Sequence, residues 1–574
     1  MGRGRAHLSQ QRPSDAAACF RKVLALAPSD AEALNDLGLA ARSGAGQAAS
    51  IRSYRRAIAT STRDPAPFNN LANALAASGN RIDASRAFDQ LRQAAPWLAE
   101  GFHNSGDNSR HLGELDPARA LLRAAIALKP GLAASQKSLA ALLMSLGEMT
   151  PAIAAQRRVL SLAPSAFDHS DLIFMLGYDE ATTNAQLFAE TKRWAIRYGG
   201  PRSTSTKEPL RDAAPDRRLR VGYVSGDFCN HPVARSLVGL LARHDRTKIH
   251  VIAYAEVARH DFMTDRFERL VDDWRLTRGL SDDEVAGQIR RDRVDILVFV
   301  AGHTGENRLS LATRRAAPIQ ISMYAPTTTG LSQIDAWMTD DVLHPVDTTE
   351  RFVEEQVRLP CLIPLEPPDA PLRAAPRRDH VVFASFNNPA KQTPAVYRLW
   401  ARVLAATPHS TLRFKYRGVY RTRSLRERII HLFRIEGIEA NRLDFVLEMQ
   451  DRGNHLADMA NVDIALDAFP FNGCNTTFDL LWMGVPVVTM LGERFLARMS
   501  AGFLSRIGLS DLIAEDDAAY VGAAAALAAD PTRRAGLRAQ LRERLAASPL
   551  CDPDAYARSV EHAYRRLWRR RCGL

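Results

Sequence analysis

The stretch Leu219-Arg-Val-Gly-Tyr-Val-Ser225 is a short, mostly apolar run that leads into a polar loop, as buried strands do. Two more runs of this kind follow at residues 248–254 and 294–300, and patterns typical of amphipathic helices lie between them at 233–243 and 281–291. Strands that alternate with helices predict a parallel, doubly wound sheet. The sequence before residue 219 follows a different pattern, so the fold changes at this point.

The same alternation begins again after a proline-rich stretch, residues 360–376, which is typical of an interdomain connection. Strands are predicted at residues 381–386, 412–416, 443–447, 462–466 and 485–489. We therefore expect two similar Rossmann-like α/β lobes in tandem, one over residues 219–375 and one over 376–574. Ligands of such sheets bind at the carboxyl ends of the strands, and a cleft between two sheets is a natural site.

Upstream of residue 219 the sequence repeats with a period of 34 residues. Pro130 lies 34 residues after Pro96, and Pro164 lies 34 residues after Pro130. Large apolar residues recur with the same spacing at Phe20, Tyr54, Phe88 and Leu122. This period is typical of tetratricopeptide repeats, which are helix pairs that stack into a superhelix. We predict an α-solenoid over residues 1–166 and a helical linker over residues 167–218.

The repeats offer a candidate surface for a protein partner. The position before the repeat leucine is polar in each repeat, as Asp36, Asn70, Asn104 and Ser138. An Asn side chain both donates and accepts, so Asn70 and Asn104 are candidate acceptor-binding residues that hold an extended peptide backbone. Ordinary solvent-facing polarity is an equally good explanation. Residues 15–27 predict a second repeat helix whose partner is mostly missing, which leaves open truncation or self-association through the repeats.

The composition limits the class of protein. The chain has 574 residues, of which 46% are hydrophobic and 24% charged, which excludes wholesale disorder and predicts several domains. Lys and Arg number 76 against 64 Asp and Glu, a formal charge of +12 that favours acidic or phosphate-bearing partners. The one dense basic run, residues 565–571, is better explained as a solvated helix face than as a nucleic-acid contact.

Cysteine use and the N-terminal sequence predict the compartment. The six cysteines are too few for a disulfide framework and form no Cys-x-x-Cys motif, which favours a reducing compartment. Residues 1–7 are polar and lead into no apolar segment, and no run approaches the roughly 18 apolar residues of a membrane span. We expect a cytoplasmic protein with no membrane and no nucleic-acid partner.

No familiar phosphate or hydrolase motif is present. The sequence lacks the P-loop, the dinucleotide-binding glycine motif after a strand, the HExxH zinc motif and the GxSxG elbow. Its one Asp-x-Asp, Asp552-Pro553-Asp554, lies in the C-terminal tail. We therefore expect no metal and no cofactor, and we expect backbone amides and basic side chains to hold any phosphate.

Residues 464–482 supply such amides. A predicted strand ends near Asp467, and a turn leads to Asn475, Thr476 and Thr477 at the start of a predicted helix. Free N–H groups and the positive end of a helix favour an anion, and the Thr hydroxyls add donors. A simple capped helix is the alternative.

Two more loops follow predicted strands and carry reactive side chains. Residues 386–391 end in Lys391, which brings a cation to the carboxyl edge of the second sheet. Residues 227–232 contain His231, which brings an imidazole to the same edge of the first sheet. A single His is usually structural, but three such loops together indicate a site at the strand ends.

The motifs of these loops resemble those of the O-linked N-acetylglucosamine transferase family, in its bacterial, SPINDLY-like group. The stretches that carry the resemblance follow tetratricopeptide repeats in the family's order and are 221–232, 301–304, 386–391, 455–458 and 469–477. The resemblance covers essentially the whole chain. It implies a GT-B fold of two lobes and metal-independent, inverting transfer from a nucleotide sugar to Ser or Thr hydroxyls of proteins.

The resemblance also implies roles for individual residues. His231 matches the active-site His of the family, and Lys391 matches the Lys that contacts the donor diphosphate. The positions that match substrate-contacting segments are Asn388 for the nucleotide, His455 and Ala457 for uridine, Asn475, Thr476 and Thr477 for the phosphates, Asp479 for ribose, and His303, Thr304 and Pro326 in the first-lobe loops.

The sequence also departs from the family pattern. The loop Tyr324-Ala-Pro-Thr-Thr-Thr-Gly330 differs from the usual glycine-rich form, and Asp458 stands where animal members have Arg. UDP-N-acetylglucosamine is the expected donor, and a protein held by the repeats is the expected acceptor. Two alternatives stay open: a transferase for another nucleotide sugar, as in flagellin glycosylation, or an inactive repeat scaffold that binds protein clients.

Overall fold

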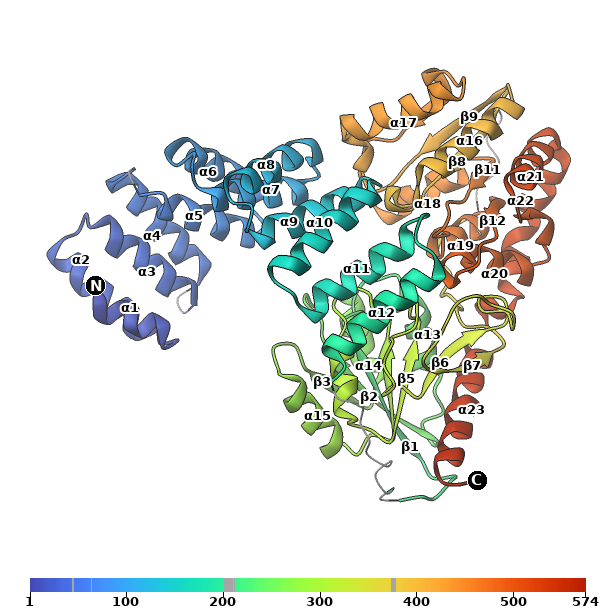
Figure 1. Ribbon diagram of the computed structural model, residues 1–574, viewed down its shortest axis with the longest axis horizontal. Helices are drawn as coiled ribbons and strands as arrows, with labels where there is room; N and C mark the ends of the chain where they lie inside the picture. Colours follow the sequence, from blue (N-terminus) through green and yellow to red (C-terminus); the bar gives the residue numbers. More distant parts are fainter. Residues whose placement is uncertain (44–45, 63, 201–209, 211, 373–377) are drawn as a thin grey trace. The chain divides into compact units, whose positions relative to one another are not determined.

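The computed structural model describes residues 1–43, 46–62, 64–200, 210, 212–372 and 378–574. It divides into two compact units (Figure 1). The first unit comprises residues 1–143, 154–163 and 421–424, and the second comprises 144–153, 164–420 and 425–574. The predicted boundary between the two lobes, at residue 375, lies outside the described residues, as do residues 201–209 and 211 of the predicted linker.

The first unit consists of helices that pack on their neighbours in chain order. The helices of the repeat region are α1 (Gly2–Ser9), α2 (Pro13–Leu26), α3 (Ala31–Ser43), α4 (Gln47–Thr60), α5 (Ala66–Ala77), α6 (Arg81–Ala94), α7 (Ala99–Leu112), α8 (Leu115–Leu128), α9 (Ala133–Ser145) and α10 (Met149–Leu162). The tetratricopeptide solenoid is therefore confirmed, and α9 and α10 contribute to both units.

The 34-residue period has a direct packing cause. Each first helix of a pair presents a small residue to the large apolar residue of the second helix. A Cβ on Gly106 would lie 2.9 Å from Cγ of Leu122, and a Cβ on Gly4 would lie 2.6 Å from the ring of Phe20. Glycine is needed where the helices approach this closely. The partner that we expected to be mostly missing before residue 15 is present as the 8-residue helix α1.

Helices α11 (Ala166–Tyr178) and α12 (Asn184–Tyr198) form another pair, which belongs to the second unit. In the sequence, these two helices lie within the predicted linker of residues 167–218, apart from Ala166. Trp194 of α12 packs edge-on against the ring of His303, with 4.9 Å between ring centroids. Ser170 of α11 lies 2.9 Å from Nδ1 of the same His. This pair is therefore packed into the first α/β lobe.

The first lobe is a seven-stranded parallel sheet in the order β3-β2-β1-β4-β5-β6-β7. Its strands are β1 (Leu219–Ser225), β2 (Ile249–Ala255), β3 (Asp273–Leu276), β4 (Ile296–Val300), β5 (Ile319–Met323), β6 (Ala336–Asp340) and β7 (Glu355–Leu359). Its helices are α13 (Ala234–Arg243), α14 (Phe262–Leu270) and α15 (Asp282–Arg291). The strands predicted at residues 219–225, 248–254 and 294–300 are confirmed as β1, β2 and β4.

The second lobe is a six-stranded parallel sheet in the order β10-β9-β8-β11-β12-β13. Its strands are β8 (Val381–Ser385), β9 (Ser410–Phe414), β10 (Leu443–Phe445), β11 (Ile464–Leu466), β12 (Val487–Met490) and β13 (Ile513–Ala514). Its helices are α16 (Pro394–Ala406), α17 (Arg423–Ile435), α18 (Arg452–Ala460), α19 (Asn475–Trp482), α20 (Met499–Arg506), α21 (Asp517–Ala529) and α22 (Pro531–Ala546). All five predicted strands are present.

The last helix, α23 (Pro553–Arg571), returns to the first lobe, where it packs on α13, β5 and β7 (Figure 1). The basic run at its end is paired within the chain, because Arg569 lies 2.6 Å from Asp216 and Arg570 lies 2.7 Å from Glu355.

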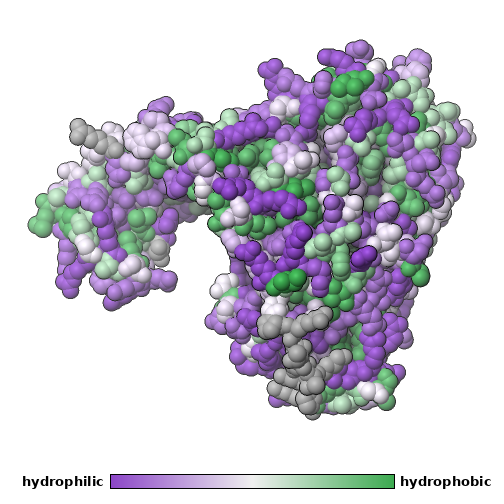
Figure 2. Space-filling view, viewed as in Figure 1, coloured by the Kyte–Doolittle hydropathy of each residue, from purple (hydrophilic) through white to green (hydrophobic). Residues whose placement is uncertain are grey.

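Polar residues dominate the face shown in Figure 2, with apolar residues in small groups between them. Within the described ranges, every helix is too short or too polar to cross a membrane.

Candidate active site

Three loops that follow strand ends meet where the two lobes contact each other. Residues 386–391 follow β8, residues 467–474 follow β11, and residues 226–233 follow β1. The side chain of Asn475 donates to the carbonyl of Pro232 over 3.1 Å and so joins the first lobe to the start of α19. The three loops predicted from sequence are thus neighbours.

Asp467 organises the loop before α19. One carboxylate oxygen accepts from the backbone N–H groups of Ala468, at 3.0 Å, and Gly473, at 2.7 Å. The same oxygen accepts from the side chain of Asn387 at 2.9 Å, and the other accepts from Thr489 at 2.8 Å. The carboxylate therefore ties the end of β11 to the loop after β8 and to strand β12. The sequence did not identify Asp467 as a site residue.

The start of α19 presents backbone donors. The N–H groups of Thr476 and Thr477 have no hydrogen-bond partner among the described residues, which is the usual state of the first turn of a helix. The Thr477 hydroxyl is buried against Ser500, at 2.8 Å, and Ser500 in turn donates to the carbonyl of Gly473. The Thr477 side chain holds the loop, and unpaired amides at the start of a helix favour an anion.

Lys391 lies beside this loop at the end of the 3₁₀ helix η2 (Pro389–Lys391). Its Nζ donates to the carbonyl of Asn472 over 2.7 Å and lies 3.8 Å from the ring centroid of Phe471. Burial lowers the pKa of Lys391 to about 8, although nearby Asp467 opposes this shift. Asn388 caps η2 by accepting from Ala390. The structure thus brings Lys391 to the loop before α19, and Asn388 lies at the start of the same 3₁₀ helix.

His231 stands in the loop after β1. Its Nδ1 lies 3.1 Å from a carboxylate oxygen of Asp227, and its side chain is 39% exposed. Burial lowers the pKa of His231 to about 4, and the positive charge of Arg417 acts in the same direction. The imidazole is therefore neutral at neutral pH.

His455 and Ala457, the predicted uridine contacts, lie on α18. The ring of His455 packs edge-on against Phe386 at 5.7 Å, next to the loop that carries Lys391. Burial lowers the pKa of His455 to about 4, and the nearby Lys415 ammonium adds to the shift. The predicted segment is therefore adjacent to the loop of residues 386–391.

Asp458, where the sequence departs from the family, has a partner that the sequence did not reveal. Its carboxylate lies 2.6 Å from the ammonium of Lys415, which is almost fully buried. Lys415 also donates to the side chain of Gln450. A buried ion pair therefore occupies this edge of the site. In the sequence, the one sign of this ion pair is that Lys415 lies at the end of an apolar strand.

Asp479, the predicted ribose contact, is buried between two arginines. Arg235 of α13 donates to one carboxylate oxygen at 2.8 Å, and Arg452 of α18 lies 3.3 Å from the other. Arg235 comes from the first lobe, so this ion pair is a second link between the lobes. Arg235 was missed because its helical position gives no signal of a distant partner.

The first-lobe candidates are placed differently. His303 is buried, and its two ring nitrogens face Ser170, at 2.9 Å, and the carbonyl of Thr329, at 3.1 Å. These contacts fix the helical pair α11–α12 and leave neither nitrogen for a substrate. Thr304 accepts at its backbone carbonyl from Asn307. Pro326 is buried. The roles of Thr304 and Pro326 stay predictions.

The candidate acceptor-binding residues lie in the first unit. The amide nitrogen of Asn70 donates to the side chain of Asn35 over 2.8 Å, and Asn104 donates in the same way to Asn69. These bonds orient both amides and leave their oxygens to accept. Asp36, the first residue of the series, is paired with an Arg at 2.6 Å.

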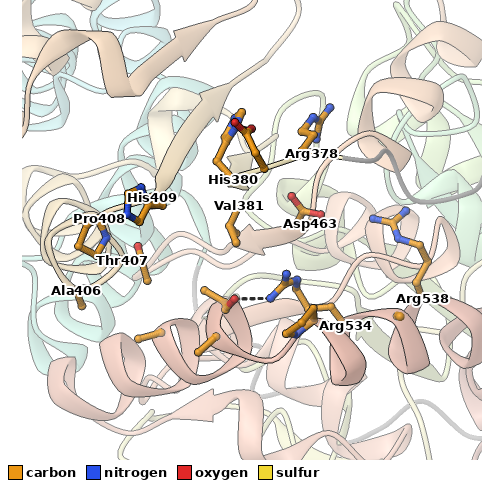
Figure 3. Close-up of a pocket in the computed structure, with 16 residues that line it drawn as sticks. Arg378, His380, Val381, Ala406, Thr407, Pro408, His409, Asp463, Arg534 and Arg538 are labelled. Carbon is orange, nitrogen blue, oxygen red and sulfur yellow. Dashed lines mark hydrogen bonds and ion pairs between the residues drawn. The ribbon is translucent and has the colours of Figure 1, made fainter.

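A cavity of about 570 Å³ opens at the other edge of the second sheet, near the first residue of β8 (Figure 3). The arginines that line this cavity donate to backbone carbonyls at helix ends, so they do not form a free positive surface. Arg538 donates to the carbonyl of Ala460 at 2.8 Å, Arg378 to that of Asn461 at 2.7 Å, and Arg534 to that of Leu527 at 2.8 Å. The carbonyl ends of α18 and α21 therefore account for these arginines.

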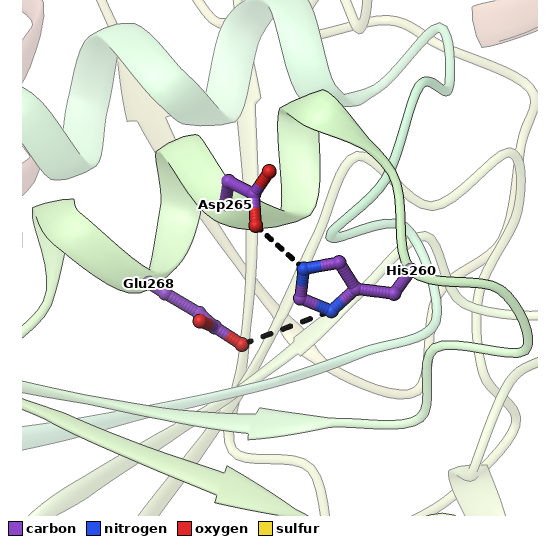
Figure 4. Close-up of side chains that lie close together, drawn as sticks. All are labelled: His260, Asp265 and Glu268. Carbon is purple, nitrogen blue, oxygen red and sulfur yellow. Dashed lines mark hydrogen bonds and ion pairs between the residues drawn. The ribbon is translucent and has the colours of Figure 1, made fainter.

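The described residues also contain a group that meets the spacing of metal ligands: His260, just before α14, and Asp265 and Glu268 within it (Figure 4). The His260 ring lies 2.6 Å from Asp265 and 4.0 Å from Glu268. All three side chains are solvent-accessible, so the ion pairs explain the cluster. It shares no residue with the candidate active site.

Comparison with known proteins relates this arrangement to one family. The model of glycosyl transferase family 41 matches residues 201–361 and 374–560. A Solanum lycopersicum protein named probable UDP-N-acetylglucosamine–peptide N-acetylglucosaminyltransferase SPINDLY is 37% identical over 413 residues, which cover 70% of this chain and 44% of that protein. The Arabidopsis thaliana protein of the same name is 35% identical, with 70% and 45% covered. This chain thus spans less than half the length of these curated relatives.

A solved structure agrees with the fold. The chain is 32% identical to a mutant of the Thermobaculum terrenum O-GlcNAc transferase, with a TM-score of 0.81 over 92% of this chain and 99% of that one. The prediction of a tetratricopeptide solenoid followed by two Rossmann-like lobes of the GT-B type is therefore confirmed.

Proposed function

Because the chain belongs to glycosyl transferase family 41, we propose that it transfers a sugar from a UDP-sugar to Ser or Thr hydroxyls of proteins. The observation that carries this proposal is the position of Lys391 beside the free amides at the start of α19. A cation and a helix N-terminus together suit the diphosphate of a nucleotide sugar. The names of the relatives support UDP-N-acetylglucosamine as the donor.

The proposed reaction is an inverting displacement without a metal ion. The acceptor hydroxyl attacks the anomeric carbon opposite to the leaving nucleotide, so the configuration at that carbon inverts. Negative charge builds on the diphosphate, where Lys391 and the amides of α19 stabilise it. His231 receives the hydroxyl proton. Arg235 and Arg452 hold Asp479 in place for a ribose hydroxyl.

The proposal extends to the acceptor and the compartment. The solenoid holds an extended segment of the acceptor protein, and the amide oxygens of Asn70 and Asn104 accept from its backbone. All six cysteines are free, which supports a reducing, cytoplasmic setting.

The direct test is transfer to candidate acceptor proteins, followed by mass spectrometry, with UDP-, GDP-, dTDP- and CMP-sugars offered separately. We expect transfer from UDP-N-acetylglucosamine, and we expect it to persist in excess EDTA. Lys391→Ala should reduce transfer by about 10²-fold or more, because it removes a charge that stabilises the leaving group. Lys248→Ala is a matched control, since the Lys248 side chain is exposed and its ammonium pairs with the surface residue Asp245.

The outcomes separate the alternatives. Transfer from a different nucleotide sugar would keep the enzyme class and change the donor. Loss of activity in EDTA with rescue by Mn²⁺ would contradict the metal-free site. If the protein binds UDP and acceptor but no sugar moves from any donor, the chain is a scaffold that binds protein clients.

A further inference from the structure

Asp227 is a buried carboxylate with a single partner. It lies two residues past the end of β1, and its side chain is 8% exposed. One oxygen lies 3.1 Å from Nδ1 of His231. Within the described ranges, the carboxylate makes no other hydrogen bond or ion pair in the structure. Burial of a carboxylate is costly unless a partner compensates, so this contact calls for a functional explanation.

We propose that Asp227 is a positioning residue for His231. Its carboxylate accepts a hydrogen bond from Nδ1–H and thereby leaves the lone pair of Nε2 free for the proton of the acceptor hydroxyl. A neutral imidazole carries one proton, so a proton fixed on Nδ1 makes Nε2 the base. This inference rests on the proposed function, in which His231 receives that proton.

The loop between the two residues is anchored on both sides. Phe228 is fully buried and packs edge-on against Phe267, with 5.2 Å between ring centroids. The backbone N–H of Asn230 donates to the carboxylate of Asp261 over 2.9 Å. These contacts fix the backbone from Asp227 to His231, so the distance between carboxylate and imidazole is set by the fold.

The two nitrogens of His231 are in different surroundings. Nδ1 faces Asp227 at 3.1 Å and the backbone N–H of Val233 at 3.4 Å. The amide contact favours the opposite proton position, but at 3.4 Å it is long for a hydrogen bond and weaker than a bond to a charged oxygen. Nε2 has no partner among the described residues, and the ring is partly exposed. The open nitrogen is therefore the one that a substrate reaches.

In the proposed step one bond to the anomeric carbon forms as another breaks, and one proton is transferred. The hydroxyl oxygen of the acceptor forms a bond to the anomeric carbon while the bond from that carbon to the diphosphate oxygen breaks. The electron pair of the broken bond stays on the diphosphate, and the hydroxyl proton moves to Nε2. The resulting imidazolium keeps its Nδ1–H on the Asp227 carboxylate, which stabilises the new positive charge.

Burial and nearby charges set the pH range in which Asp227 is ionised and His231 is neutral. Burial and the nearby Glu306 raise the pKa of Asp227 to about 7. Burial and Arg417 lower the pKa of His231 to about 4. The other titratable groups that face this loop are Cys229 and Asp261. Protonated Asp227 donates to Nδ1 and moves the imidazole proton to Nε2, so kcat should rise as pH increases through about 7.

The test uses Asp227→Asn in the full chain. The Asn amide donates to Nδ1 and favours the proton on Nε2, so we expect kcat for transfer to fall about 10²-fold or more. The rise in kcat through pH 7 should disappear, while UDP affinity and thermal unfolding stay unchanged. In a His231→Ala background the same substitution should have no further effect. Asp265→Asn, which changes an exposed carboxylate of α14, is the matched control.

A second measurement does not depend on activity or on the variant. The ¹⁵N chemical shifts of the His231 imidazole at pH 8 report which nitrogen carries the proton, and we expect Nδ1. A proton on Nε2, or an equal effect of Asp227→Asn with and without His231, would overturn the positioning role. Absence of any sugar transfer by the wild type would contradict the proposed function instead, while the ¹⁵N shifts would still decide the proton position.

Discussion

Lys391 links the pH of the solution to the affinity for the donor. Its pKa is lowered to about 8, mainly by burial. A bound diphosphate favours the charged form, so the affinity for UDP should be constant below pH 8. It should fall by up to about tenfold per pH unit above pH 8, as the free protein loses this proton. Titration calorimetry from pH 7 to 9.5 measures this, in a range where the terminal phosphate is already ionised.

Lys391→Arg is the control for this pH dependence. An arginine stays charged over the whole range, so the affinity of that variant for UDP should not change with pH. Calorimetry in buffers of different ionisation enthalpy should also show proton uptake by the wild type near pH 8.5. Equal UDP affinity of the wild type at pH 7 and pH 9.5 would contradict a direct contact of Lys391 with the diphosphate.

Single residues were predictable from sequence only where they stand in a local motif. His231 and Lys391 follow predicted strands within short characteristic loops, and the structure places both beside α19. Asp227, the partner of His231, lies in the same loop, but the contacts of Lys391 with Asn472 and of Arg235 with Asp479 were not predictable, because they join residues far apart in the chain. His303 stood in a characteristic motif, yet the structure surrounds it with α11 and α12, whose packing on the lobe leaves no sequence signal.

At the scale of elements, the loop between β11 and α19 depends on one glycine. A Cβ on Gly473 would collide with the Thr477 hydroxyl and lie 3.2 Å from Asp467. Gly473→Ala should therefore lower the free energy of unfolding by about 1–3 kcal/mol, because a buried loop must shift. It should also weaken UDP binding about tenfold or more. Thermal unfolding and calorimetry measure the two effects.

Gly453→Ala is the matched control for this loop. Gly453 lies in the exposed first turn of α18, where a Cβ meets only an ordinary contact at 3.4 Å. Alanine is the better helix former, so this variant should be at least as stable as the wild type. If Gly473→Ala binds UDP as tightly as Gly453→Ala does, the loop is not the diphosphate site.

Elements were predictable where they are buried and apolar. Strands β1, β2 and β4 are buried along most of their length and were recognised as apolar runs. Five strands were missed: β3, β5, β6, β7 and β13. Strand β3 is partly exposed and contains Asp273 and Arg275, while β13 is only 2 residues long. Strands β5 and β6 are buried but carry polar residues among the apolar ones, and β7 is a partly exposed edge strand. An edge strand does not need an apolar sequence, because its backbone pairing with one neighbour is enough to define it.

At the scale of the whole molecule, donor and acceptor recognition should be separable. All candidate donor-site residues belong to the second unit, and the solenoid residues Asn70 and Asn104 belong to the first. Deletion of residues 1–130, or the double replacement of Asn70 and Asn104 by Ala, should spare UDP binding. The double replacement should weaken acceptor binding by about 1–3 kcal/mol, as expected for two lost hydrogen bonds.

Titration of acceptor protein and of UDP against each variant measures this separation. Gln93→Ala, at an exposed position of α6, is the control for a polar side chain outside the recurring polar position that Asn70 and Asn104 occupy. If the truncated chain or the double variant holds its acceptor as tightly as the wild type, the repeats serve assembly or another partner.

The return of α23 to the first lobe has a consequence for synthesis of the chain. Tyr564 hydrogen-bonds Tyr223 over 3.1 Å, and Glu561 lies 2.9 Å from His244, so the last helix packs on a lobe whose first strand lies more than 300 residues earlier. The ribosome synthesises α23 after the whole of the second lobe. The apolar side chains of the first lobe that α23 covers therefore stay exposed until synthesis ends, and we expect chaperones to bind the nascent chain in that interval.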